Sequence, residues 1–308
     1  MAWNVPTYAA PVPPAVLVLA AASSVQCGAA LSVTIFDDLG PAGASALRVA
    51  FAAVILMAIW RPRVRDVPRA DLVLCAQLGL TLGVMNLTFY ESLDRLPLGI
   101  AVTIEFVGPL GLAVALSRRR LDLVWVGLAA AGILLFAQPG GGGIDPVGLM
   151  FILIAAACWA LYIVLAARAG QRFTGARGLA LAMVVAALVP LIPGIAEAGS
   201  ALLEPQFLAI GAAVALLSSV IPYSLEMEAL RRMPRQVFGV LMSMEPAVAA
   251  LAGLNLHGQS LSATDVCAIL LVTAASVGAT RTTPPMQIRA VRDWITEVAA
   301  DPRGFVGL

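Results

Sequence analysis

The chain has 308 residues, of which 60% are hydrophobic and 12% charged, and its formal net charge is +1 at pH 7. Soluble domains are about half apolar and about one quarter charged, so this composition excludes an ordinary soluble domain and indicates an all-α polytopic membrane protein. The net charge by itself indicates no partner. We expect the lipid bilayer to surround the chain and expect no nucleic acid as a partner.

The hydrophobic residues fall into ten apolar stretches of roughly 18–25 residues, the length that a helix needs to cross the hydrocarbon core. Helices are expected because every backbone polar group in lipid must be satisfied within its own segment. Before them, residues 1–14 are rich in proline and uncharged, which predicts a short disordered lead. Turn-forming residues predict connections at 37–41, 139–143 and 193–194. The spans are predicted near 15–36, 42–60, 70–91, 98–117, 121–138, 147–168, 177–194, 206–230, 235–256 and 262–280.

The segment around Glu105 returns in the second half of the chain without a gap. A repeat of this length predicts two five-span units, at 15–138 and 147–281, joined by the glycine-rich stretch 139–146. Because five is an odd number, the second unit is inserted upside down relative to the first. Inverted repeats with a site near the midplane between them are typical of secondary transporters. The matched pairs, at one constant offset, are Glu91 with Glu228, Leu93 with Leu230, Arg95 with Arg232, Pro97 with Pro234, Pro109 with Pro246 and Ala113 with Ala250.

Arginine, which supplies all 19 basic residues, predicts the orientation. The connections after even-numbered spans and the C-terminal tail hold every arginine except Arg48 and Arg95. Because positive residues stay on the cytoplasmic side, both termini are expected inside the cell. Residues 282–308 are expected to form a cytoplasmic tail with a helix that lies on the membrane surface.

Two carboxylates are predicted at membrane depth, each close to a proline. Glu105 lies in the fourth span and Glu245 in the ninth. Charged groups there are costly and usually functional. Burial disfavours the charged form of a carboxyl group, so proton exchange by these residues is chemically available. The alternative is a structural glutamate that joins helices by a hydrogen bond.

Arg48 is the only basic residue within a predicted span, about six residues from its outer end. A guanidinium group there can pair with a buried glutamate or hold a substrate carboxylate with two parallel hydrogen bonds. The alternative is that its side chain extends to the outer interface.

Other polar and aromatic side chains recur in the apolar spans, and together they could line a small polar cavity. Asn86 and Tyr90 share one helix face because they are four residues apart. The alternative for any one of them is a helix–helix contact without ligand. The candidates for binding substrate or proton are Arg48, Asn86, Tyr90, Glu105, Tyr162, Tyr223, Glu226 and Glu245. Gln26 and Trp159 are further polar or aromatic residues within the predicted spans.

Sequence signatures of enzymes are missing. The chain contains no GxSxG, HExxH or P-loop pattern, and His257 is its one histidine. The four cysteines lie far apart in apolar runs, so we expect no metal site and no cofactor.

Three stretches carry a resemblance to a known family. They are PLGIAVTIEFVGPL at 97–110, IPYSLEMEALRRMP at 221–234 and FGVLMSMEPAVAALAG at 238–253. The chain resembles the drug/metabolite transporter superfamily of the EamA type, and within it the bacterial inner-membrane threonine/homoserine exporters, over about residues 15–281.

The resemblance implies secondary active export of small neutral amino acids by proton antiport across the bacterial inner membrane. By position, Glu105, Glu226 and Glu245 correspond to acidic residues of the family motifs, and Arg48 to an arginine common in the second span. The chain departs from the family at Gln259, where a glutamate is usual. The expected partners are an amino acid and a proton, and the protein is expected to be a monomer or homodimer.

Two other functions remain open from the residues. One is export of another metabolite or of a drug-like cation, which an aromatic cavity with glutamate as its sole counter-charge would favour. The other is a membrane-embedded enzyme acting on lipid, for which the chain supplies no matched nucleophile and base.

Overall fold

The computed structural model describes residues 12–115, 122–136, 145–222, 225–226, 229, 233, 238, 241–259 and 261–282. These residues form helices and their connections. The disordered lead, the glycine-rich junction and the C-terminal tail predicted above lie almost entirely outside the described residues.

The helices follow the apolar stretches of the sequence. The first part of the chain forms α1 (Pro14–Val33), α2 (Phe36–Trp60), a short 3-10 helix (Val64–Asp66), α3 (Arg69–Leu93), α4 (Leu98–Glu105), α5 (Val107–Ala115) and α6 (Asp122–Phe136). The second part forms α7 (Pro146–Arg172), α8 (Arg177–Ala198), a 3-10 helix (Gly199–Leu203), α9 (Pro205–Ala215), a π-helix (Leu216–Val220), α12 (Glu245–His257) and α13 (Ala263–Thr282).

Among the described residues, five helical segments are long and apolar enough to cross a membrane. They are Pro14–Val33, Phe36–Trp60, Arg69–Leu93, Pro146–Arg172 and Arg177–Leu203. Shorter apolar helices cover Leu98–Leu112, Val124–Leu135, Pro205–Val220 and Ala263–Gly278. Five of the ten predicted spans are thus confirmed as helices of membrane length, and the rest remain predictions.

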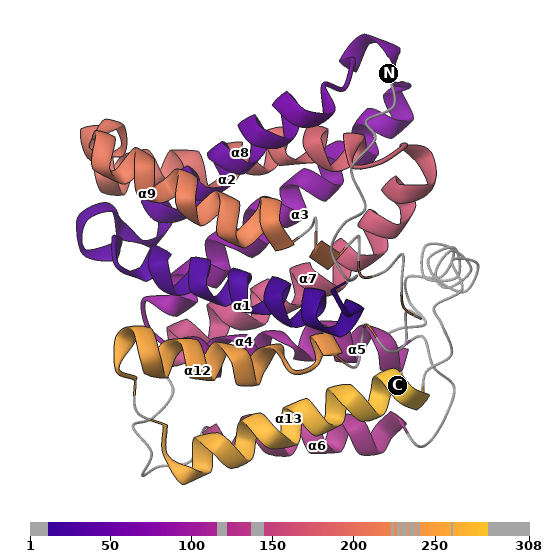
Figure 1. Ribbon diagram of the computed structural model, residues 1–308, viewed down its shortest axis with the longest axis vertical. Coiled ribbons are helices and arrows are strands. Elements are labelled where there is room, and N and C mark those ends of the chain that lie inside the picture. Colours follow the sequence, from indigo (N-terminus) through magenta and orange to yellow (C-terminus); the bar gives the residue numbers. More distant parts are fainter. Residues whose placement is uncertain are drawn as a thin grey trace.

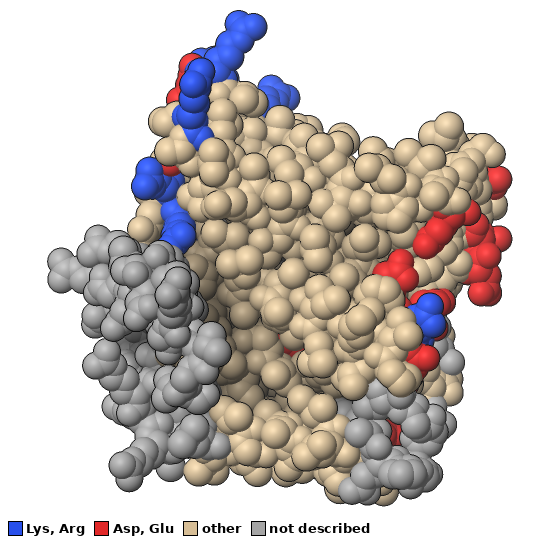
Figure 2. All heavy atoms as spheres, turned by 180° about the vertical axis from the view of Figure 1, so that it is seen from behind, with Lys and Arg blue, Asp and Glu red and all other residues tan. Residues whose placement is uncertain are grey.

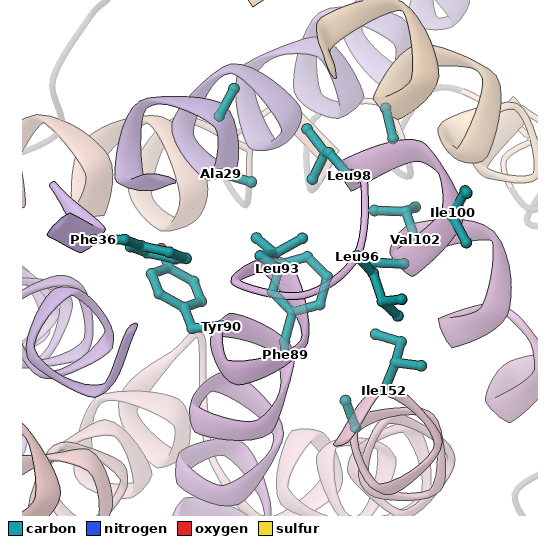
Figure 3. Packing of buried hydrophobic residues seen from close by; sticks show 14 of the residues in the cluster. Ala29, Phe36, Phe89, Tyr90, Leu93, Leu96, Leu98, Ile100, Val102 and Ile152 are labelled. Atoms are coloured by element: carbon teal, nitrogen blue, oxygen red, sulfur yellow. The ribbon is translucent and has the colours of Figure 1, made fainter. Parts of the chain in front are cut away.

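Helices from the two halves of the chain are interleaved (Figure 1). In the second half, α8 packs on α2 and α3, while α12 packs on α4 and α1. At one end of the molecule, α13 lies along α6. A buried cluster around Leu93, Leu98 and Ile152 fills the centre and joins α3, α4 and α7 (Figure 3).

The connection predicted at 193–194 is wrong, because α8 continues through Pro193 to Ala198. A proline inside a helix removes one backbone hydrogen bond, and here neighbouring helices hold the segment. An added Cβ on Gly194 would lie 2.9 Å from the carbonyl oxygen of Ala42, so α8 and α2 approach closely at this point. The predicted turn formers at 37–41 also lie within α2, where they make a kink at Gly40.

Gly40 interrupts α2 with a positive φ of 67°, a conformation that glycine adopts without steric cost. Pro41 follows and restarts the helix. The backbone N–H of Ala42 donates to Oε2 of Glu197 at 3.0 Å, so a carboxylate from the end of α8 satisfies a donor exposed by the kink.

Charged side chains gather at the two ends of the helices (Figure 2). Arg61, Arg63, Arg172 and Arg177 surround one hollow at the ends of α2, α3, α7 and α8, where Arg172 pairs with Asp71 at 2.9 Å. Figure 2 shows acidic residues gathered at the opposite edge, with a broad uncharged surface between the two edges.

Substitution of Gly108 can test how closely α5 packs on α7. A Cβ at this position would run into the backbone carbonyl oxygen of Ala156, which cannot move like the tip of a side chain. We expect Gly108→Ala to lower the free energy of unfolding by about 1–3 kcal/mol, the usual cost of overpacking. The matched control is Gly111→Ala in the same helix, where a Cβ meets nothing within 4 Å. Thermal unfolding of the two variants in mild detergent measures the difference, and equal stability would contradict the close contact.

Candidate functional site

A cavity of about 190 Å³ lies among helices that come from both halves of the chain. It brings together six of the eight predicted site residues: Arg48, Asn86, Glu105, Tyr162, Glu226 and Glu245. Tyr90 lies outside the lining, beside Arg48, and Tyr223 lies outside the described residues. The rest of the lining consists of Val25, Gln26, Ala29, Met85, Phe89, Val102, Trp159, Ser218, Pro222 and Met242.

Both glutamates predicted at membrane depth sit at helix ends. Glu105 is the last residue of α4, and the helical path resumes in α5 at Val107. Pro109 has no N–H to donate to the carbonyl of Glu105, four residues earlier, and its ring crowds that carbonyl. Glu245 is the first residue of α12, and Pro246 follows it in the first turn. Proline is well tolerated there because the N–H it lacks would have had no partner in the helix.

Glu245 is joined to α1 by a hydrogen bond. Nε2 of Gln26 donates to Oε1 of Glu245 at 3.0 Å, and both side chains are buried. Gln26 is not among the eight site residues predicted from the sequence. The signal that could have indicated Gln26 is its amide side chain, which lies within a 20-residue helix of mostly apolar and small residues, Pro14–Val33.

Arg48 lies in the middle of the 25-residue helix α2. Because α2 restarts at Pro41 after the kink at Gly40, Arg48 lies seven residues beyond Pro41 in the regular part of the helix. The depth of Arg48 below the outer face stays a prediction. Nη1 of Arg48 donates to the hydroxyl of Tyr90 in a long hydrogen bond of 3.4 Å, and its guanidinium carbon lies 5.4 Å from the centre of the Tyr90 ring. Such contact with an aromatic face stabilises a cation.

Tyr90 is therefore placed to position Arg48 from outside the cavity. Its side chain is fully buried, and its ring packs between Phe36 and Phe89 at centroid distances of 5.8 and 6.1 Å (Figure 3). Within the described part of the chain, no carboxylate lies within ion-pair distance of Arg48. Among the described residues Arg48 therefore makes no direct ion pair, although Glu105 lines the same cavity.

A π-helix borders the cavity at Leu216–Val220. Pro222 lacks the N–H that would bond to the carbonyl of Ser218, which favours this irregular winding. Ser24 of α1 donates to the carbonyl oxygen of Leu217 at 2.7 Å. Single-turn π-helices within α-helices are frequent at functional sites because they redirect backbone groups.

Aromatic and amide side chains complete the wall. Trp159 packs edge-on against Phe106 with ring centroids 4.9 Å apart, next to the end of α4. Asn86 donates through Nδ2 to the carbonyl of Leu82 at 2.8 Å within its own helix, which holds the amide in place. The cavity therefore combines one arginine, three glutamates and two amides, Asn86 and Gln26, with an apolar wall.

Comparison with known proteins agrees with this architecture. Residues 146–281 match the model of the EamA-like transporter family. The chain is 43% identical over 273 residues to proteins named threonine/homoserine exporter RhtA from Salmonella typhimurium and from Escherichia coli strain K12, covering 87% of this chain and 92% of theirs. It is 27% identical over 228 residues to the uncharacterized inner membrane transporter YedA of Escherichia coli, covering 70% of this chain and 72% of that protein.

A solved crystal structure also has the same fold. It superimposes with a TM-score of 0.57 at 17% sequence identity and covers 87% of this chain and 97% of its own. The family resemblance inferred from the three sequence motifs is confirmed by the relatives at 43% identity. The chain belongs to the EamA-like transporter family and lies close to RhtA within it.

Proposed function

We propose that this protein exports small neutral amino acids, threonine and homoserine among them, across the bacterial inner membrane by proton antiport. The observation that carries the proposal is the cavity in which Arg48 and the carboxylate of Glu245 line one space. Further support comes from the RhtA relatives, which are named threonine/homoserine exporters.

An amino acid is a zwitterion, and the charges around the cavity suit it. Its carboxylate needs a positive partner in a poorly hydrated site, since an unpaired buried ion costs several kcal/mol. Arg48 has no described carboxylate partner within ion-pair distance and can offer parallel N–H groups. The three glutamates of the lining can compensate the positive ammonium group.

The size of the cavity favours a small substrate over a drug-like cation. Sites for drug-sized ligands have volumes of roughly 300–1,000 Å³, and this cavity has about 190 Å³. A cation exporter would also have no use for an arginine without a carboxylate partner in its binding site. Both observations favour the amino acid over the first alternative.

The proposed architecture is ten spans in two inverted repeats, 15–138 and 147–281. Three features support it: the matched sequence pairs, the family match over residues 146–281, and the helix ends at Glu105 and Glu245. Interrupted helices beside a site are typical of inverted-repeat transporters. We propose a monomer or a homodimer as the transporting unit.

We place the arginine-rich edge of the molecule in the cytoplasm, and with it both termini. The separation of basic and acidic residues in Figure 2 supports this orientation through the positive-inside rule. The inner membrane is the proposed location, and the YedA relative carries that location in its name.

Transport in everted membrane vesicles tests the function and the proton coupling together. With an acidic interior, vesicles that contain the protein should accumulate labelled threonine, because proton efflux drives amino-acid entry. Glu105→Gln and Glu245→Gln keep the size and hydrogen bonding of each side chain but remove its titration. We expect each variant to lose most of the gradient-driven accumulation while protein levels remain normal. No accumulation by the wild-type protein would reject amino-acid export, and normal accumulation by both variants would reject coupling through these glutamates.

Variants of Arg48 distinguish a role in substrate binding from a structural role. We expect Arg48→Ala to abolish threonine transport and Arg48→Lys to reduce it by at least about tenfold, because lysine keeps the charge but loses the planar pair of donors. Both variants should retain normal protein levels. The comparison is the initial rate of uptake at equal protein amounts. A structural Arg48 predicts the opposite pattern, namely an unstable Ala variant and a Lys variant with normal transport.

Accessibility of single introduced cysteines tests the orientation. In a variant without the four native cysteines, a membrane-impermeant thiol reagent added to spheroplasts should modify position 145, which follows a predicted outer connection. It should spare position 65, in the connection between α2 and α3. Labelling of position 65 and protection of position 145 would reverse the proposed orientation.

A further inference from the structure

Three buried polar atoms of residues that line the cavity lack a hydrogen-bond partner among the described residues. They are Oε1 of Gln26, Oε2 of Glu245 and Oγ of Ser218. Their residues all line the cavity, and they are only 2%, 7% and 6% exposed. Buried polar groups are nearly always paired, so unpaired atoms at a cavity indicate that something else supplies the partner.

The bond between Gln26 and Glu245 determines which atom of the amide remains free. In its ionised form the carboxylate of Glu245 only accepts hydrogen bonds, and the amide nitrogen of Gln26 faces it. The amide oxygen of Gln26 and the second carboxylate oxygen of Glu245 are then both left as acceptors. Each can take a hydrogen bond from a donor in the cavity.

The π-helix brings Ser218 to the same stretch of α1. A Cβ on Gly28 would collide with Oγ of Ser218, so the hydroxyl lies directly against the helix backbone two residues after Gln26. The bond from Ser24 to the carbonyl of Leu217 joins the same two segments. Unpaired polar atoms of α1, the π-helix and the start of α12 therefore belong to residues that line the same cavity.

These acceptors match an ammonium group, which carries three N–H donors and a positive charge. The arginine of the cavity lies elsewhere, on α2, where it contacts Tyr90 of α3. We propose that Gln26, Ser218 and Glu245 form the subsite for the α-ammonium group of the transported amino acid. This inference rests on the proposed function and adds the orientation of the bound amino acid. Its ammonium group lies toward α1 and α12, and its carboxylate lies toward Arg48.

The subsite makes Gln26 a specificity-determining residue. An α-amino acid satisfies both ends of the cavity, whereas a hydroxy acid without the amino group leaves the acceptors near Gln26 unpaired. A site built to hydrogen-bond a group rejects an analogue that lacks it strongly, because its own buried polar atoms then remain unsatisfied.

Three ligands that differ by one group test the inference on the purified full-length protein. They are homoserine, γ-hydroxybutyrate (homoserine without its amino group) and propanolamine (homoserine without its carboxylate). Calorimetry gives the affinity of each for the wild-type protein and for Gln26→Met, an apolar side chain of similar size. We expect Gln26→Met to weaken binding of homoserine and propanolamine by about tenfold or more, the usual effect of a lost bond to a charged group. Binding of γ-hydroxybutyrate should change by less than about threefold by the same reasoning.

Two further variants serve as a second test and a control. Ser218→Ala removes a hydroxyl that has no described partner, so it should fold normally and weaken the two amines severalfold. It carries the test if Gln26→Met does not fold. Ser45→Ala removes another buried, unpaired hydroxyl that is not part of the cavity lining, and it should leave all three affinities unchanged.

The outcomes separate this inference from the proposed function. Equal weakening of all three ligands by Gln26→Met would overturn the inference and leave Gln26 as a structural partner of Glu245. Tighter binding of γ-hydroxybutyrate than of homoserine by the wild-type protein would also overturn it. Wild-type protein that binds propanolamine through Gln26 but does not bind homoserine would support the ammonium subsite and reject the proposed substrates.

Discussion

A charged side chain at the depth of the hydrocarbon must find its compensation inside the protein, because lipid offers neither counter-ions nor hydrogen bonds. In this chain the constraint explains why Arg48, Glu105 and Glu245 line a single cavity instead of lying on separate helix surfaces. Two of them have a partner on another helix: Arg48 contacts Tyr90 of α3, and Glu245 bonds to Gln26 of α1. The stability of these groups and the chemistry of the cavity thus depend on the same contacts.

The backbone faces the same constraint as the charges. An uninterrupted helix satisfies its own N–H and C=O groups, so irregular backbone at membrane depth is tolerated only where protein or a water-filled cavity surrounds it. The break after Glu105, the start of α12 at Glu245 and the π-helix at 216–220 all border the cavity. Pro109, Pro246 and Pro222 lie next to these three irregular segments. The chain therefore departs from regular helix where freed backbone groups and polar side chains can serve a ligand.

Interleaving of the two halves builds the cavity. Because α8 packs on α2 and α3, and α12 on α4 and α1, residues from both halves face one another across it. Small residues permit this close approach, as the contact of Gly108 with the Ala156 carbonyl shows. Movement of one half against the other would change the distance between Arg48, which belongs to the first half, and Glu245, which belongs to the second.

The sequence by itself determined the helical class, most helix positions, and the polar residues that could form a site, because hydrophobic run length and the cost of a charge in lipid are local properties of the chain. Six of the eight selected residues line the cavity for that reason. Only the tertiary structure decided that α8 continues past Pro193, that Tyr90 positions Arg48, and that Gln26 bonds to Glu245, 219 residues away. These outcomes depend on which helices become neighbours, and a polar residue in an apolar stretch does not specify which partner it will meet after packing.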